Sequence, residues 1–195
     1  MKPAKPLAFL AFLFLAAGLC ARQTVVLDRN DVRTVDAGGQ GRPADPAKAA
    51  FVDAALKAFA GGAPFDAVLP LVNPPAWGRV VSPETGGVLQ IRTAFAGGFV
   101  FHLSLAHLLP FHRYILTLNG NPQRSGNEYL ADPVPGNEKE RYYDFFIATT
   151  DAGGSYGGDF AVFLHPGDYD IRFYVKDTAD FKIVLYHDFF PIKVL

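Results

Sequence analysis

The sequence predicts an all-β protein, an antiparallel β-sandwich of about seven strands with one N-terminal amphipathic helix. Beyond Gly87, hydrophobic residues recur at every second position, which is the period of a half-buried strand. The chain contains 18 Phe and 8 Tyr but only one Trp, and phenyl rings without a polar group favour burial in a sheet core. Glycine and proline turn signals separate the alternating segments.

Residues 1–21 are predicted to be a secretory signal peptide. Lys2 and Lys5 form a basic start, and the apolar run over 7–19 is shorter than the roughly 20 residues of a membrane-spanning helix. A lipid anchor at Cys20 is not expected, because bacterial lipoproteins place a small residue directly before the cysteine and Leu19 stands there. The protein is therefore expected to be secreted or periplasmic, with no transmembrane segment.

Cysteine content and charge limit the chemistry further. Cys20 is the only cysteine, so no intramolecular disulfide can form and stability must come from a packed core. The formal net charge is −1 before the signal peptide is removed, and no basic stripe is present. A nucleic-acid partner is therefore not expected.

Residues 22–86 are predicted to form a linker, a helix and a proline-rich packed segment before the β domain. Residues 24–27 are predicted to form one short strand or an extended segment. The glycines of residues 36–45 are typical of a linker. Prolines interrupt every pattern between residues 63 and 86, which predicts a packed loop rather than a regular element.

The helix is expected over residues 46–60. Asp45 is a suitable N-cap, and Pro46 suits the first helical position, where a backbone N–H is not needed. Hydrophobic residues then recur at spacings of three and four, and Gly61 follows the last of them. The apolar side of this helix is expected to pack on the main domain or on a partner.

Residues 87–195 are predicted to be the β-sandwich domain. A long connection over 121–141 has no regular pattern, and connections of this length are commonly functional or mobile. The alternating segments that predict strands are residues 89–95, 99–105, 114–118, 142–150, 160–164, 169–175 and 181–195.

Two predicted turns have similar sequences, Leu-Pro-Phe-His-Arg-Tyr over 109–114 and Leu-His-Pro-Gly-Asp-Tyr over 164–169. A tyrosine that opens a sandwich strand often bonds its hydroxyl to a nearby backbone group, which is the tyrosine corner. Tyr114 and Tyr169 are in this position. Two corners predict two places where the chain crosses between sheets.

The segment from Thr150 to Ile171 resembles a motif of a known family. Its residues 150–156 (TDAGGSY) and 164–171 (LHPGDYDI) are similar to the TDxxGxY…LxPGxYxV hairpin of bacterial prealbumin-like (carboxypeptidase regulatory-like) β-sandwich modules. The spacing here is longer, with Gly157 and Gly158 as the insertion. The resemblance implies a sandwich with a non-catalytic accessory or adhesive role, and it carries over no functional residue, because the matching positions are turn residues and core aromatics.

Metal binding is one alternative function. The corner turns could bring His112 and His165 to one end of the sandwich for copper or zinc, and the acidic, glycine-rich residues 151–159 could curl around calcium. No histidine pair has a recognised ligand spacing, and aspartates beside glycines are typical of turns. No metal ligand and no cofactor are therefore assigned.

An enzyme is not expected either, because the sequence contains no catalytic motif such as G-x-S-x-G. The leading hypothesis is a structural or macromolecule-binding module with a protein or polysaccharide partner. The partner would contact residues 121–141 and the outward sheet face that carries Tyr174, Val184 and Tyr186. Carbohydrate binding is the second alternative, because aromatic rings on exposed strand faces are suitable stacking platforms. The candidate ligand-binding residues are Trp77, Tyr129, Tyr174 and Tyr186.

Overall fold

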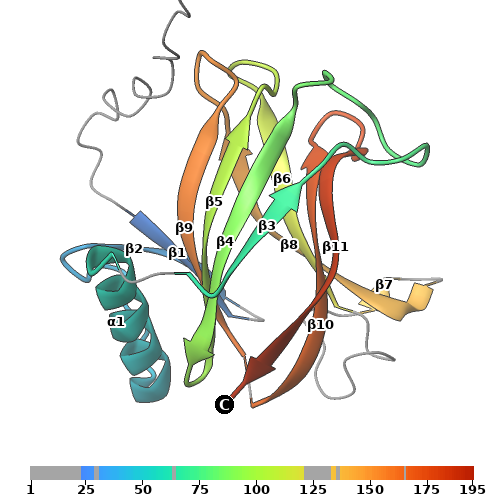
Figure 1. Ribbon diagram of the computed structural model, residues 1–195. Helices are drawn as coiled ribbons and strands as arrows, with labels where there is room; N and C mark the ends of the chain where they lie inside the picture. The colour runs from blue at the N-terminus through green and yellow to red at the C-terminus, as the bar shows by residue number, and fades with distance from the viewer. Residues whose placement is uncertain (1–22, 29–30, 63–64, 121–132, 135–136, 165) are drawn as a thin grey trace, which may run out of the picture.

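In the residues that it describes, the computed structural model contains two β-sheets and one helix, which confirms the all-β class (Figure 1). It describes residues 23–28, 31–62, 65–120, 133–134, 137–164 and 166–195. The predicted signal peptide, Cys20, Tyr129 and His165 lie outside the described residues, as does most of the connection over 121–141. Within the described part of the chain, no helix combines the length and the apolar character needed to cross a bilayer.

The first sheet has six strands: β1 (Gln23–Asp28), β2 (Asp31–Asp36), β3 (Ala67–Leu71), β4 (Gly86–Phe95), β5 (Gly98–Ala106) and β9 (Tyr156–Phe163). Their spatial order is β2-β1-β9-β5-β4-β3. Neighbouring strands are antiparallel except β1 and β9, which run parallel, so the prediction of a purely antiparallel fold is wrong at this pair. Parallel pairing is possible here because a long stretch of chain separates the two strands.

The second sheet has five strands: β6 (Arg113–Gly120), β7 (Pro133–Val134), β8 (Asn137–Thr149), β10 (Gly167–Asp177) and β11 (Ile183–Val194). Their order is β11-β10-β6-β8-β7, and all pairs are antiparallel. The two sheets together contain more strands than predicted. The additional strands are the very short β7 and three strands within residues 22–86, namely β1, β2 and β3. Strand β3 lies in the segment that was predicted to be a loop, and it tolerates Pro70 because it lies at a sheet edge.

The main core lies between the two sheets and combines a group of phenyl rings with a larger number of Leu, Val and Ile side chains. The Phe101 ring centroid lies 4.9 Å from that of Phe160, on the same sheet, and 5.9 Å from that of Phe173, on the opposite sheet. All three side chains are fully buried. The alternation read from the sequence places these rings inward, because successive residues of a strand point to opposite faces.

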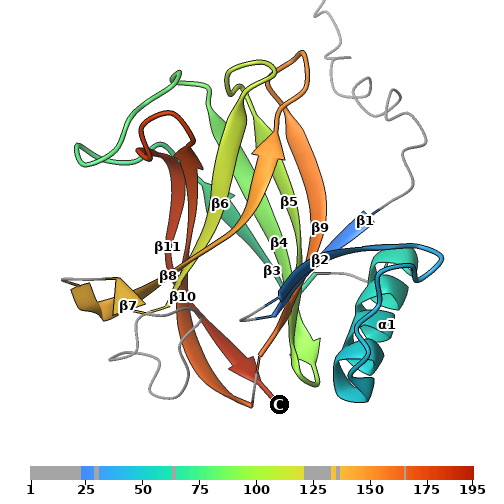
Figure 2. The same cartoon turned by 180° about the vertical axis from the view of Figure 1, so that it is seen from behind.

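Helix α1 (Pro46–Ala60) packs on the outer face of the six-stranded sheet, beside β1 and β2 (Figure 2). Its buried residues Phe51, Val52 and Ala55 form a second hydrophobic cluster with sheet residues that include Val100 and Ala161. A sheet face that would otherwise expose hydrophobic side chains is therefore covered. This cover explains why both faces of the first part of β5, residues 98–101, are buried.

The helix begins as its sequence predicts, with the Asp45 side chain accepting a hydrogen bond from the Lys48 N–H at 3.0 Å. We expect Asp45→Ala to lower the free energy of unfolding by about 1 kcal/mol, because this N–H loses its partner. Urea unfolding followed by circular dichroism would measure the loss. Asp45→Asn keeps an acceptor and is the matched control, so equal losses in both variants would contradict a capping role.

Both predicted corners are places where the chain passes from one sheet to the other. Residues 107–112 connect β5 to β6, and the chain after β9 continues into β10, so β9 and β10 are not partners in one hairpin. The two corners lie at opposite ends of the domain, because β6 and β10 are antiparallel and pair Tyr114 with Asp177. The corner that contains His112 and the start of β10 are therefore at different ends, and His165 itself lies outside the described residues.

Candidate binding site

The connection between β3 and β4, residues 72–85, links the two sheets and is called the Trp77 loop here. It leaves the edge of the six-stranded sheet and runs along β11, the edge strand of the other sheet (Figure 1). Val72 and Tyr186 exchange two backbone hydrogen bonds of 3.0 Å, and the Arg79 N–H donates to the Ile183 carbonyl at 2.9 Å. These bonds fix the loop on both sides of Trp77.

Three aromatic side chains meet where this loop crosses the outer face of the five-stranded sheet, and we call Trp77, Tyr174 and Tyr186 the aromatic site. The Trp77 ring centroid lies 5.1 Å from that of Tyr186 and 6.4 Å from that of Tyr174. The two tyrosines are direct cross-strand neighbours on β10 and β11. They lie on the outer face, because Phe173 and Val175 fill the core side of β10.

Exposure differs among the three rings. Trp77 is 55% exposed, Tyr186 is partly buried, and Tyr174 is only 4% exposed. The expectation that Tyr174 and Val184 stand on an exposed face is wrong. Tyr174 lies beside Trp77 and Arg172, and Val184 is fully buried in the main core. The structure thus brings together three of the four predicted ligand-binding residues, and Tyr129 lies outside the described residues. Trp77 is the ring most available to a ligand.

Arg172 forms a polar border to the aromatic site. Its Nε donates to Asp188 Oδ1 at 2.9 Å, and its Nη1 donates to the Tyr174 hydroxyl at 3.3 Å. The guanidinium carbon lies 3.8 Å from the ring centroid of Phe189, which is a cation–π contact. Arg172 is therefore held in place by an acid, a hydroxyl and a ring.

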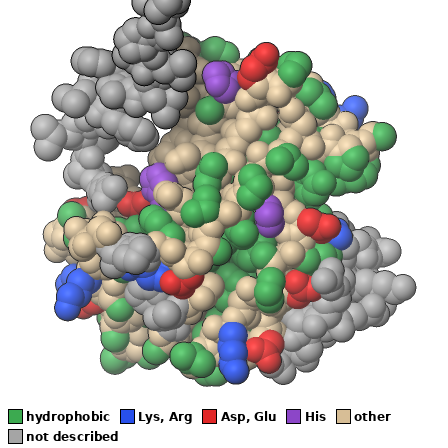
Figure 3. All heavy atoms as spheres, viewed as in Figure 1, with side chains coloured by type: hydrophobic (Ala, Val, Ile, Leu, Met, Phe, Trp, Pro, Cys, Tyr) green, Lys and Arg blue, Asp and Glu red, His purple; other side chains and the backbone are tan. Residues whose placement is uncertain are grey.

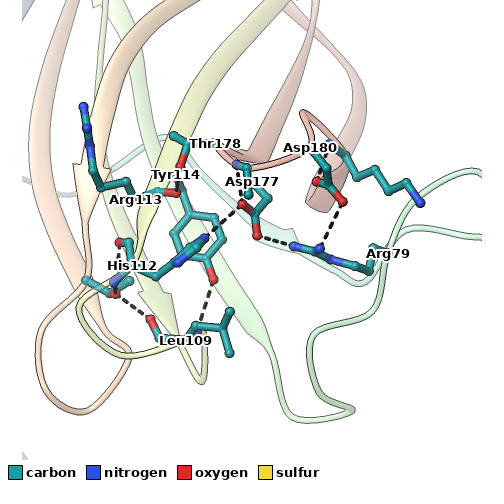
Figure 4. Close-up of polar contacts among 11 residues, drawn as sticks. Arg79, Leu109, His112, Arg113, Tyr114, Asp177, Thr178 and Asp180 are labelled. Carbon is teal, nitrogen blue, oxygen red and sulfur yellow. Dashed lines mark hydrogen bonds and ion pairs between the residues drawn. The ribbon is translucent and has the colours of Figure 1, made fainter.

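A buried carboxylate anchors the other side of the Trp77 loop (Figure 4). Asp177, at the end of β10, is 1% exposed and forms an ion pair with Arg79. It also accepts from His112 Nε2 at 2.9 Å and from the Ala179 N–H at 2.8 Å. Arg79 additionally contacts Asp180 Oδ2 at 3.0 Å. One carboxylate thus joins the Trp77 loop, the β5–β6 corner and the β10–β11 turn.

The ionisation of Asp177 follows from these contacts. Burial by itself would raise the pKa of Asp177, but the hydrogen bonds from Ala179 and His112 and the Arg79 contact together lower it below its ordinary value. The carboxylate is therefore negatively charged at neutral pH and can neutralise Arg79.

Stability should depend on pH through Asp177. Because its pKa is lower in the folded protein than in the unfolded chain, its stabilising contribution is complete above about pH 4 and is lost as the pH falls through the lower, folded-state pKa. We expect the difference in unfolding free energy between the wild type and Asp177→Asn to shrink in that acidic range. Urea unfolding of both proteins over a pH series would measure it, and a difference that stays constant would contradict the assignment.

The tyrosine corner predicted at Tyr114 is confirmed. The Tyr114 hydroxyl accepts a hydrogen bond from the Leu109 N–H at 3.1 Å, and the Thr150 hydroxyl donates to the Leu109 carbonyl at 2.6 Å. The ring packs edge-on against His112, with centroids 4.9 Å apart. The corner therefore positions the histidine that contacts Asp177.

Removal of the Tyr114 hydroxyl should weaken the tyrosine corner. We expect Tyr114→Phe to lower the free energy of unfolding by about 1 kcal/mol, because the Leu109 N–H loses its acceptor while the buried ring is kept. Thermal unfolding would show the loss as a lower midpoint. An unchanged midpoint would mean that the hydroxyl contributes nothing to stability.

His102 and His187 have separate partners. His102 Nδ1 contacts Asp159 Oδ1 at 2.6 Å on the outer face of the six-stranded sheet, and His187 Nδ1 donates to the Pro70 carbonyl at 2.8 Å. Asp151, proposed for calcium, accepts from backbone N–H groups of its own turn. Within the described residues, no group of three or more His, Cys, Asp or Glu is placed to hold a metal ion. The metal alternative thus gains no support from this part of the chain.

Sequence reasoning missed the anchor of the site. Arg79 and Asp177 are 98 positions apart, and neither belongs to a motif. The only available signal was that the Trp77 loop contains an arginine and the β10–β11 turn contains acids.

Comparison with family models, curated proteins and solved structures found no match for this chain.

Proposed function

We propose that this protein is an exported, non-catalytic binding module that contacts a macromolecule through the aromatic site. The observation that supports the proposal best is the exposure of Trp77, because a large aromatic ring normally gains free energy from burial. Tryptophan is also enriched among the residues that dominate binding energy at interfaces.

The support beneath Trp77 favours a binding role over a loose surface loop. Backbone bonds at Val72 and Arg79 flank the ring, and the Arg79 side chain is held by a buried carboxylate. A ring that is already ordered loses little conformational entropy when a ligand arrives, so more of the contact energy contributes to affinity. The site is therefore pre-organised.

Export and module type are parts of the same proposal. The basic start and apolar run of residues 1–21 support secretion or a periplasmic location. The two packed sheets are compatible with a prealbumin-like β-sandwich module, as the motif over residues 150–171 implies. Such a module would support or bind another macromolecule in the cell envelope or outside the cell.

Retention of macromolecules on immobilised protein would test this function. A soluble extract of cell-surface polymers is passed over the wild type, Trp77→Ala and Phe111→Ala. Phe111 is a matched control, because it is a 74% exposed aromatic residue in the corner between β5 and β6. We expect Trp77→Ala to weaken retention at least about tenfold, which corresponds to about 1.4 kcal/mol, and Phe111→Ala to have little effect. Equal retention by the wild type and Trp77→Ala would refute the proposal.

A further inference from the structure

We infer that the ligand of the aromatic site is a neutral polysaccharide, one of whose pyranose rings stacks on Trp77. This inference rests on the proposed binding function. It follows from the orientation of the rings, from the pairing of the bordering charges, and from the kind of groups that surround the indole.

Trp77 is 55% exposed, which leaves part of the indole surface open to a ligand. The planes of Tyr174 and Tyr186 are both inclined at 74° to the plane of Trp77, so neither tyrosine ring lies parallel over the indole. An indole face carries partial negative charge and attracts the weakly positive C–H groups on the flat side of a sugar ring. The exposed Trp77 ring therefore has the shape and polarity of a sugar platform.

The charges that border the platform are paired. Arg79 contacts Asp177 and Asp180. Arg172, which contacts Tyr174, is paired with Asp188. Among the described residues, acidic and basic side chains on the face shown in Figure 3 lie scattered or in mixed groups, without a large patch of one sign. Such a surface has no strong field to select an anionic or a cationic polymer, so the expected ligand is uncharged.

The neighbours of Trp77 favour a sugar over a protein partner. A protein hot spot is commonly an anchor within a desolvated apolar core of the interface. Here the ring is bordered instead by the side chains of Tyr186 and Tyr174, two rings that carry hydroxyl groups, and Arg172 donates to the Tyr174 hydroxyl. Donors and acceptors held at fixed positions beside a ring match the hydroxyl groups of a pyranose.

Tryptophan fluorescence gives a direct test, because Trp77 is the only tryptophan in the chain. The protein is titrated with soluble β-glucan, galactomannan and dextran as neutral probes, and with alginate and heparin as anionic probes. We expect at least one neutral polymer to give a saturable change in emission, with an affinity that changes less than about twofold between low and high salt. Binding to an anionic probe alone, with steep salt dependence, would overturn the inference.

Affinity gel electrophoresis with the same polymers tests the role of the ring. Trp77→Ala should lose at least about tenfold in affinity, Trp77→Phe should lose less because a ring remains, and Phe111→Ala should bind as the wild type does. Equal binding of a neutral polymer by Trp77→Ala would overturn the inference.

Treatment of the retained cell-surface material separates this inference from the proposed function. Periodate, which cleaves the diols of sugar rings, should abolish Trp77-dependent retention, and protease should not. If protease abolishes it and periodate does not, the ligand is a protein, so the inference fails while the binding function stands. If retention does not depend on Trp77, the proposed function itself fails.

Discussion

Replacing Asp177 with asparagine is expected to lower the free energy of unfolding by about 3 kcal/mol. The side chain is fully buried and accepts hydrogen bonds from His112, Ala179 and Arg79. A neutral amide cannot neutralise Arg79, and its NH₂ group would face other donors. This loss of unfolding free energy lies at the lower end of the range of about 3–5 kcal/mol for removing one partner of a buried ion pair, because Arg79 and His112 keep partial contact with water.

Urea unfolding at neutral pH would measure this loss, and Asp180→Asn is the matched control. Asp180 contacts the same guanidinium but is far more exposed, so its replacement should cost less than about 1 kcal/mol. Similar small losses in both variants would show that Asp177 has no special role. A large loss for Asp177→Asn alone would establish it as the anchor of the Trp77 loop.

Asp177→Asn should also weaken ligand binding at the aromatic site. Without the Asp177 contact, Arg79 no longer holds its side of the Trp77 loop, and the indole must be ordered when a ligand binds. The ordering cost then reduces affinity even though the aromatic site keeps its residues. Stability and binding are therefore coupled through one carboxylate.

Local patterns were sufficient to predict much of the fold. Asp45 and Pro46 mark the helix start because capping depends on a few adjacent residues, and β5 and β6 follow from simple alternation. The edge strand β3 was not predictable, because it contains Pro70 and is mostly exposed. The parallel pairing of β1 with β9 was also beyond local reasoning, since it depends on contacts between distant segments.

The site was predictable only as separate residues. Residue type identified Trp77, Tyr174 and Tyr186, and the β10–β11 hairpin brings the two tyrosines together. The position of Trp77 above them depends on how the Trp77 loop crosses between sheets, which no local pattern encodes. The link from Arg79 to Asp177 has the same origin, a tertiary contact between segments far apart in the sequence.

Replacing Phe101 with alanine is expected to cause the largest loss of stability, about 4 kcal/mol. Its ring lies within 6.0 Å of the Phe99 ring and 6.4 Å of the Phe145 ring, in addition to the contacts with Phe160 and Phe173 described above. These rings come from both sheets, so a cavity at Phe101 removes contacts on both sides of the core. Neighbouring rings cannot easily fill it, because close-packed side chains relax only partly.

Chemical denaturation of Phe101→Ala and of Phe111→Ala would test this prediction on one residue type. Phe111 is exposed, so its replacement should change the free energy of unfolding by less than about 0.5 kcal/mol. A loss below about 1.5 kcal/mol for Phe101→Ala would mean that the rings are not packed between two sheets. Because Phe101 lies inside the core and Trp77 on the outer face, native tryptophan emission should stay unchanged while stability falls. That separation would show that the core maintains the fold, whereas the Trp77 loop and its buried carboxylate determine the properties of the aromatic site.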